Sequence, residues 1–155
     1  MKNMHRIVIA LLIMVLMVLE MSSTVAVFAA AGYKDVNKKT IDAKSIRSIK
    51  LIKKAGGFKG VFAGKKFRPN SKMTRRQYLM VLDNLYPGKV TVTMNDLKKA
   101  NKPVTEKYVT SKMVKVADKY GMTITWDGGR KKLSRASVAN YIKSFAEFDS
   151  AFAID

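Results

Sequence analysis

Four stretches of the chain place apolar residues at the three- and four-residue spacings of an amphipathic helix. Gly56-Gly57, Pro87-Gly88 and Gly121 end the first three stretches, since glycine and proline commonly follow a helix C-terminus. The predicted apolar faces are Ile46, Ile49 and Ile52; Tyr78, Leu79, Val81, Leu82 and Leu85; Val109, Met113, Val116 and Tyr120; and Val138, Ile142 and Phe145. The pattern predicts a mainly α fold in which the helices pack as a small bundle.

One stretch between the last two helices has a different pattern. Asp127-Gly128-Gly129 is a turn signal, and the strand-forming residues on either side of it could pair as a short hairpin near 122–133.

The four helices divide into two helix–loop–helix units of similar plan. The first unit spans 32–88 and the second 92–148, which leaves 149–155 as a C-terminal tail. The units align at the starts of their second helices, where Met73-Thr74-Arg75 matches Leu133-Ser134-Arg135. Each match is an apolar residue, a hydroxyl residue suited to cap a helix, and an arginine.

The first helix start also has the sequence of a capping box, from Thr74 to Gln77. Arg75 and Arg135 would then stand beside the free backbone N–H groups of a helix N-terminus, an arrangement that suits an anion. A cation is unfavourable there because it opposes the helix dipole, so an arginine at both positions indicates a role beyond stability.

Residues 1–31 are predicted to be a secretory signal peptide. Lys2, His5 and Arg6 precede an apolar run over 7–19, and Ala29-Ala30-Ala31 supplies small residues for cleavage after Ala31, with cleavage after Ala29 as a second option. The run is shorter than the roughly 20 residues of a membrane-spanning helix, which disfavours the alternative of a retained anchor.

Charge and composition narrow the function classes. The chain carries 30 Lys and Arg, 11 Asp and Glu and a net charge of +19, and it has no cysteine. Loss of 1–31 removes the only histidine, His5, and leaves +18. Without histidine or cysteine the usual general bases, nucleophiles and metal ligands are missing, and the acidic residues are scattered, so we expect no catalysis, metal or cofactor. An exported cation points to an anionic partner outside the cell rather than to intracellular nucleic acid.

At these residues the sequence resembles the S-layer homology family. Tyr33-Lys34-Asp35-Val36 is similar to the family's opening, and the helix before Gly56-Gly57 is similar to its first helix and glycine stop. Gly64 to Asn70 resembles the family's loop, and Met73 to Tyr78 resembles its Ile-Thr-Arg-Ala-Glu-Phe signature. Leu133 to Val138 is a weaker second copy.

The resemblance implies non-covalent attachment of an exported protein to the wall or surface of a bacterium, with a Gram-positive host favoured by the absence of cysteine. The implied ligand is an anionic secondary cell-wall polysaccharide, pyruvylated in much of the family, or peptidoglycan. Arg75 and Arg135 are the implied ligand arginines. The resemblance implies, more weakly, that four further residues form the wall of the groove that holds the ligand: Asp35, Gly57, Asp96 and Gly121. Family members usually arrange three repeats around a pseudo-threefold axis, so two repeats here imply self-association to complete the set.

Three other functions are less consistent with the sequence than attachment to a cell wall. The charge alone would suit a secreted cationic protein that acts on membranes or extracellular polyanions, although the lysine pairs are spread over every segment rather than gathered on one amphipathic helix. A nucleic-acid binder would need exposed aromatic residues, and Trp126 is the only candidate. Trp126 could instead stack on a sugar or cap a small hydrophobic cluster. An enzyme would most plausibly be a glycosidase, but no pair of carboxylates stands out.

Overall fold

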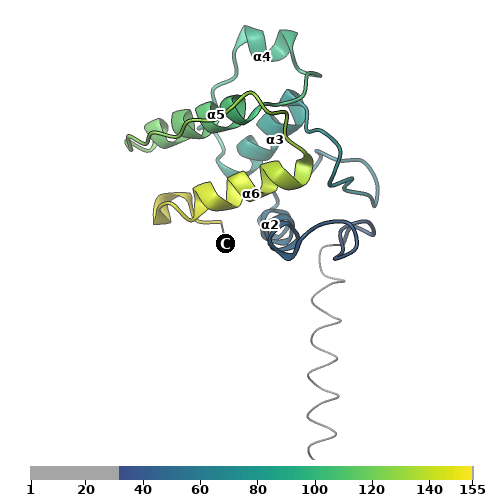
Figure 1. Cartoon of the computed structure of the whole chain (residues 1–155). Helices are drawn as coiled ribbons and strands as arrows, with labels where there is room; N and C mark the ends of the chain where they lie inside the picture. Colours follow the sequence, from purple (N-terminus) through teal and green to yellow (C-terminus); the bar gives the residue numbers. More distant parts are fainter. Residues whose placement is uncertain (1–31, 155) are drawn as a thin grey trace, which may run out of the picture. The chain divides into compact units, whose positions relative to one another are not determined.

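The computed structural model describes residues 32–154, so the predicted signal peptide lies outside the described residues. Within this range the secondary structure is helical (Figure 1). Its helices are α2 (Ala43–Lys54), α3 (Arg75–Leu85), α4 (Met94–Lys98), α5 (Glu106–Lys119), α6 (Arg135–Ala146) and the short 3-10 helix η1 (Ser150–Phe152). Over 32–154, β pairing is limited to isolated bridges. The prediction of a mainly α bundle is confirmed.

Four of these helices, α2, α3, α5 and α6, are those that the sequence predicts, whereas α4 and η1 are additional. Thr74 caps α3 in a full capping box: its Oγ1 accepts from the Gln77 N–H at 3.3 Å, and the Gln77 Oε1 accepts from the Thr74 N–H at 3.2 Å. The hydroxyls of Thr105 and Ser134 cap α5 and α6 by accepting from the N–H groups of Tyr108 and Ser137. Gly121, with φ of +75°, follows α5 in the left-handed conformation that glycine adopts without a steric penalty.

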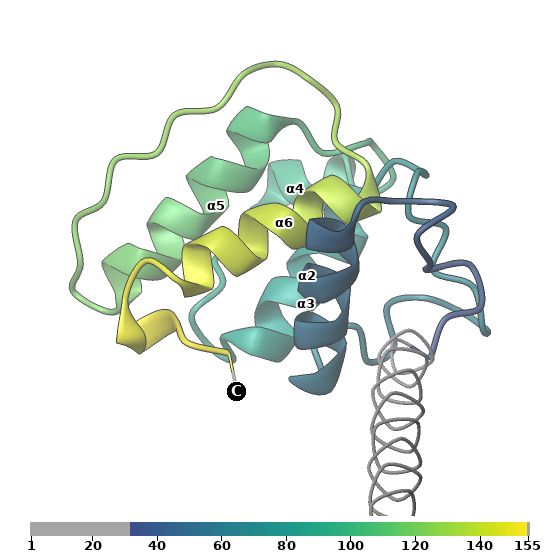
Figure 2. The ribbon, with the colours of Figure 1, turned by 60° about the horizontal axis from the view of Figure 1, so that its bottom comes forward.

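Helix α6 lies across the unit and packs against α2, α5 and η1 (Figure 2). The predicted apolar faces supply the core, and most of their members are buried; Leu85 is only partly buried and Tyr120 is exposed. Between α2 and α6, Asn140 binds the two serines of α2, since its Oδ1 accepts from the Ser48 hydroxyl at 2.7 Å and its Nδ2 donates to Ser45 at 2.8 Å. The described residues from Tyr33 onward form a compact unit that contains this core, as an independently folding domain does.

Three chain segments meet at the centre of the unit in a closed ring of backbone hydrogen bonds. The N–H of Met73 donates to the carbonyl of Leu133 at 3.2 Å, that of Leu133 to Val104 at 3.1 Å, and that of Val104 to Met73 at 2.9 Å. All three side chains are buried. Because these residues stand just before the caps of α3, α5 and α6, the three helices start from one point with approximate threefold symmetry.

A second set of bonds repeats this symmetry one step outward. The N–H of Arg75 donates to Lys102 at 3.0 Å, that of Glu106 to Lys131 at 3.0 Å, and that of Arg135 to Ser71 at 2.9 Å. Each helix therefore places its first residue against the loop that leads into another of the three helices. The sequence pattern predicts that Arg75 and Arg135 are equivalent, but it does not predict Glu106 as the third equivalent position.

These bonds correct one expectation. The first-turn N–H groups of α3 and α6 are not free for an anion, because loop carbonyls and cap hydroxyls accept all of those that the interpretation invoked. Any anion at these helix starts would have to be bound by side chains.

The hairpin near 122–133 is also corrected. Residues 122–129 form neither helix nor strand and make no β bridge with 130–133. The carbonyls of Gly129 and Lys131 instead accept from the first turn of α5, at 2.9 Å and 3.0 Å, and Lys132 bridges to Thr105. The threefold ring therefore takes the backbone groups that the second strand of a hairpin would use.

Candidate functional site

Arg135 opens onto a cationic pocket. The pocket has a volume of about 320 Å³, and its lining includes Lys66, Arg68, Gln77 and Arg135. The Arg135 guanidinium lies over the ring of Phe62, with Cζ 4.3 Å from the ring centroid, and its Nη1 donates to the Phe67 carbonyl at 2.6 Å. These contacts hold the arginine in one orientation at the pocket wall.

The loop that forms the rest of the pocket is fixed by Asp35. The Asp35 carboxylate accepts from the N–H of Phe67 at 2.8 Å and from that of Arg68 at 2.7 Å. An aromatic cluster packs the same loop, with ring centroids between 5.0 and 6.5 Å apart: Tyr33, Phe58, Phe62 and Phe67. Asp35 therefore positions the pocket and does not line it.

The pocket is electrostatically unbalanced. None of the carboxylates within 32–154 forms an ion pair with Arg135, and its buried Nε has no hydrogen-bond partner. Burial, with the nearby Arg68 cation, lowers the pKa of Arg135 from its ordinary value, and the Asp35 carboxylate, which lies beyond ion-pair distance, partly opposes this effect. The guanidinium stays charged at neutral pH, since an arginine pKa begins above 12. The pocket thus presents three cationic side chains, and the Nε of one of them, Arg135, has no hydrogen-bond partner.

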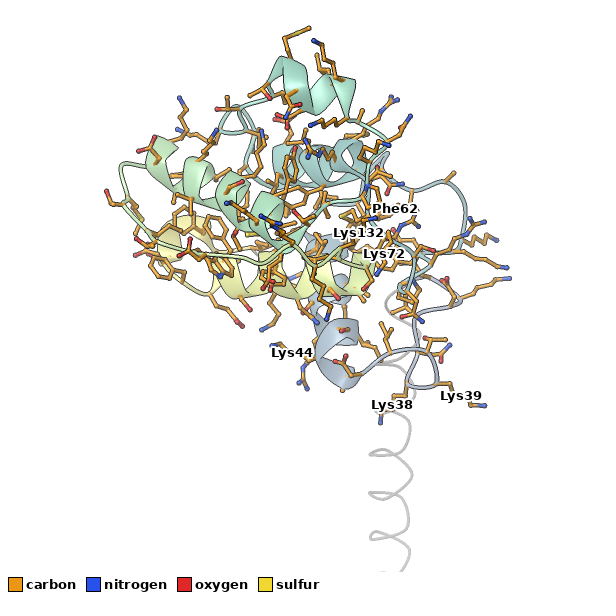
Figure 3. All side chains as sticks on the ribbon, turned by 45° about the horizontal axis from the view of Figure 1, so that its top comes forward. Lys38, Lys39, Lys44, Phe62, Lys72 and Lys132 are labelled. Atoms are coloured by element: carbon orange, nitrogen blue, oxygen red, sulfur yellow. The ribbon has the colours of Figure 1, made fainter. Side chains whose placement is uncertain are left out.

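Further lysines stand close to this helix start. The Lys72 ammonium donates to the Lys132 carbonyl at 3.3 Å, and Figure 3 shows these two lysines together with Phe62. Lys72 also forms the β bridge to Ser134, the cap of α6. They add positive charge to the surroundings of the pocket.

Arg75, the equivalent residue on α3, has a different environment. Its guanidinium covers the ring of Tyr108, with Cζ 4.3 Å from the centroid, and its Nη1 lies 3.9 Å from the Asp96 Oδ1. Its side chain is 18% exposed, and its Nε also lacks a partner. Asp96 is 3% exposed, so Arg75 lies against a carboxylate that belongs to the fold.

Asp96 is the centre of a buried polar cluster. Its carboxylate accepts from the Lys112 ammonium at 2.6 Å, from the Tyr108 hydroxyl at 2.7 Å and from the Thr93 N–H at 2.8 Å. Burial opposes ionisation of Asp96, but the hydrogen bonds from Lys112, Tyr108 and Thr93 outweigh it and hold its pKa well below the usual range. Burial, with the bond to Asp96, raises the pKa of Tyr108. These bonds give Asp96 a part in holding the fold, and its assignment to a ligand groove stays a prediction.

Glu106 fills the third equivalent position with the opposite charge. Its carboxylate accepts from the Tyr141 hydroxyl and from the Gly129 N–H, the latter at 3.0 Å. The bond from Tyr141 is the main cause of a lowered pKa at Glu106, and burial with that bond raises the pKa of Tyr141 to about 12. The sequence signal that could have found this position is Val104-Thr105-Glu106, which repeats the apolar, hydroxyl and charged order of the other two starts.

The remaining predicted residues lie elsewhere. Gly57 follows α2, where an added Cβ would lie 2.6 Å from Ile52 and 3.0 Å from Leu85, so close packing requires glycine. Gly121 ends α5, and neither glycine lines the Arg135 pocket. Trp126 stacks on Phe145 with an interplanar angle of 18° and also contacts Tyr141, an arrangement that favours its role as a cap on a hydrophobic cluster.

Residues 32–154 contain no group of His, Cys, Asp and Glu side chains that could hold a metal ion, and no helix in that range is long and apolar enough to cross a bilayer. Comparison of the chain with protein-family models, curated proteins and solved structures found no match.

Proposed function

We propose that this chain is a non-catalytic binding module of the bacterial cell envelope, and that its Arg135 pocket takes an anionic group of an exported wall polymer. The observation that carries the proposal is the meeting of Arg135, Lys66 and Arg68 at one pocket, where Arg135 has no carboxylate partner among the described residues. A guanidinium binds carboxylate or phosphate oxygens through charge-assisted hydrogen bonds, which are the stronger class.

The symmetry of the helix starts supports the resemblance to S-layer homology modules. Two sequence repeats left the expected threefold arrangement incomplete, and α5 supplies a third helix start within the same chain. Self-association to complete a set of three repeats stays a prediction. Export, which rests on the predicted signal peptide at 1–31, would bring the pocket to the polymer.

Binding in this pocket is assigned to side chains alone. Arg135 is held by Phe62 and by the Phe67 carbonyl, so its guanidinium is oriented before a ligand arrives and loses little freedom on binding. Lys66 and Arg68 add charge from a loop that Asp35 fixes. A secondary wall polysaccharide with carboxylate or phosphate groups fits this chemistry.

The test is a pull-down of residues 32–155 with purified wall sacculi, before and after removal of the secondary polysaccharide. Arg135→Ala should weaken binding by about tenfold or more, the loss expected for a hydrogen bond to a charged group. Arg130→Ala is the matched control, because it removes the same charge from an exposed arginine that does not line the pocket. Equal losses in both variants would assign binding to general charge and reject the pocket. Retention on stripped sacculi would move the ligand to peptidoglycan.

A further inference from the structure

Helix α4 carries an exposed apolar patch that the proposed function does not use. Among residues 32–154, five large apolar side chains are exposed, and three of them lie in α4 or just before it. Val92 is 51% exposed, Leu97 60% and Met94 68%. We call these three residues, with Lys98 and Lys99, the α4 patch. Clusters of this kind mark an interaction surface more often than single exposed apolar residues do.

The helix is oriented by its carboxylate. Asp96 points inward, 3% exposed and bonded to Lys112 and Tyr108. Leu97 and Lys98 stand three and four residues after Met94, so they share one face of the helix, and Asp96 lies on the opposite face. The same bonds that hide the negative charge therefore present apolar and basic side chains to the outside.

The outward face is cationic as well as apolar. From Pro87 to Glu106 the only acid before Glu106 is Asp96, whereas Lys89, Lys98, Lys99 and Lys102 are basic. Lys98, Lys99 and Lys102 are exposed. The one carboxylate of this segment before Glu106 is 3% exposed, so an anionic surface would meet mainly lysines, each of which adds attraction.

The position of α4 suits contact with an extended surface. It packs on α3 and stands at the end of the unit opposite α2 (Figure 1). A groove of about 380 Å³ beside it continues the surface toward α3, and its lining combines apolar residues with one cation and the buried carboxylate: Leu79, Met80, Val92, Leu97, Ala100, Arg76 and Asp96. Apolar side chains at a tip, with lysines directly beside them, form the pattern of an interfacial anchor.

We propose that the α4 patch docks the exported chain onto an anionic lipid surface, with Met94 and Leu97 entering the headgroup region and Lys98 and Lys99 contacting lipid phosphates. The patch and the Arg135 pocket share no residue, so the two proposals stand or fall separately. Binding at both would place the module between the outer face of a membrane and the wall polymer.

The test is co-sedimentation of residues 32–155 with vesicles of phosphatidylglycerol mixed with phosphatidylcholine, and with vesicles of phosphatidylcholine alone. The wild-type chain should bind the anionic vesicles and only weakly the neutral ones. The Met94→Ser, Leu97→Ser double variant should lose about tenfold or more in partition, because the inserted apolar area is removed. Phe148→Ser is the matched control, since Phe148 is as exposed as Leu97, at 60%, but lies outside the patch.

A second readout distinguishes insertion from adsorption by charge. Met94→Trp in a Trp126→Phe background places the only tryptophan of the chain on the patch. Its fluorescence should shift to the blue and become quenched by quenchers attached within the lipid headgroup region. Lys98→Gln with Lys99→Gln should weaken binding more than Lys131→Gln with Lys132→Gln, which removes the same charge elsewhere.

Three results would overturn the proposal. One is the absence of binding to anionic vesicles. Another is binding that salt abolishes but the serine variants leave unchanged, which would assign it to the overall charge. The third is a concentration-dependent dimer that the serine variants disrupt in the absence of lipid, which would assign the patch to a second copy of the chain.

Discussion

Arg75 and Arg135 occupy equivalent positions in the fold and differ in what surrounds them. Each follows a helix cap, donates its N–H to a loop carbonyl, covers an aromatic ring at 4.3 Å and buries a partnerless Nε. Arg75 then meets the buried Asp96, whereas Arg135 meets Lys66 and Arg68 at a pocket. The backbone symmetry is shared, and the residues packed beside each arginine differ: a buried carboxylate lies beside Arg75, and an open pocket lies beside Arg135.

This difference separates two roles that the sequence treats as one. A buried ion pair contributes to folding only as long as both partners remain, and removal of one leaves an uncompensated charge. Replacement of an arginine that has no ion pair should cost less folding free energy than removal of one partner from a buried ion pair. At Arg135 the same replacement would also remove a charged donor from the ligand of the proposed pocket. Variants at the two arginine sites should therefore differ in their free energies of unfolding and in their binding to wall sacculi.

The largest effect is expected at Asp96. Asp96→Asn leaves the Lys112 ammonium, which is 5% exposed, beside a neutral amide and should lower the free energy of unfolding by about 3–5 kcal/mol. Denaturant unfolding measures the loss, and Asp83→Asn, at an exposed acid of α3, is the control, expected to stay within about 0.5 kcal/mol. Wall binding of the folded fraction should not change. A loss near the control value would mean that Arg75 and Lys112 do not depend on this carboxylate.

The pH dependence of stability should single out the same carboxyl group. The pKa of Asp96 is lower in the folded chain than in the unfolded chain, where it is about 3.9. Its contribution is therefore complete well above pH 4 and is lost as the pH falls below the unfolded value toward the folded one. Unfolding free energies measured from neutral pH downward should fall more steeply for the wild type than for Asp96→Asn. Parallel curves would contradict the prediction.

A smaller effect is expected when Arg75 itself is removed. Arg75→Ala loses the contact with Tyr108 and the long ion pair, but Asp96 keeps Lys112, so the free energy of unfolding should fall by about 1–2 kcal/mol. Binding to wall sacculi should stay close to that of the wild type. Arg135→Ala loses the matching contact with Phe62 and the bond to the Phe67 carbonyl, so its free energy of unfolding should also fall by about 1–2 kcal/mol, but its binding to wall sacculi should fall by about tenfold or more. If both variants lose binding equally, the division between the two sites is wrong.

The sequence predicts the helices and caps well because these depend on local patterns. Thr74 and Gln77 carry their capping box in four consecutive residues, and Ile46, Ile49 and Ile52 define a buried face by spacing alone. The division between the arginines depends on contacts distant in the chain. Nothing near Arg75 in the sequence indicates Asp96, and nothing near Arg135 indicates Arg68. Glu106 was missed because its charge is opposite to that of the residues it matches.

The smallest predicted effect concerns Arg68 and would separate stability from binding at the open pocket. Arg68 is the one non-glycine residue within 32–154 with a positive φ, 54°, and it is held there by the Asp35 carboxylate. A side chain in this conformation costs about 1 kcal/mol, and such strain persists where the surroundings enforce it, commonly at functional sites. Arg68→Gly should therefore raise the free energy of unfolding by about 1 kcal/mol and weaken wall binding several-fold, because the pocket loses a cation. Arg68→Lys, which keeps both the charge and the strain, should change neither quantity much. If Arg68→Gly is stabilised and still binds like the wild type, the pocket depends on Arg135 and Lys66 alone, and the strained arginine serves the turn rather than the ligand.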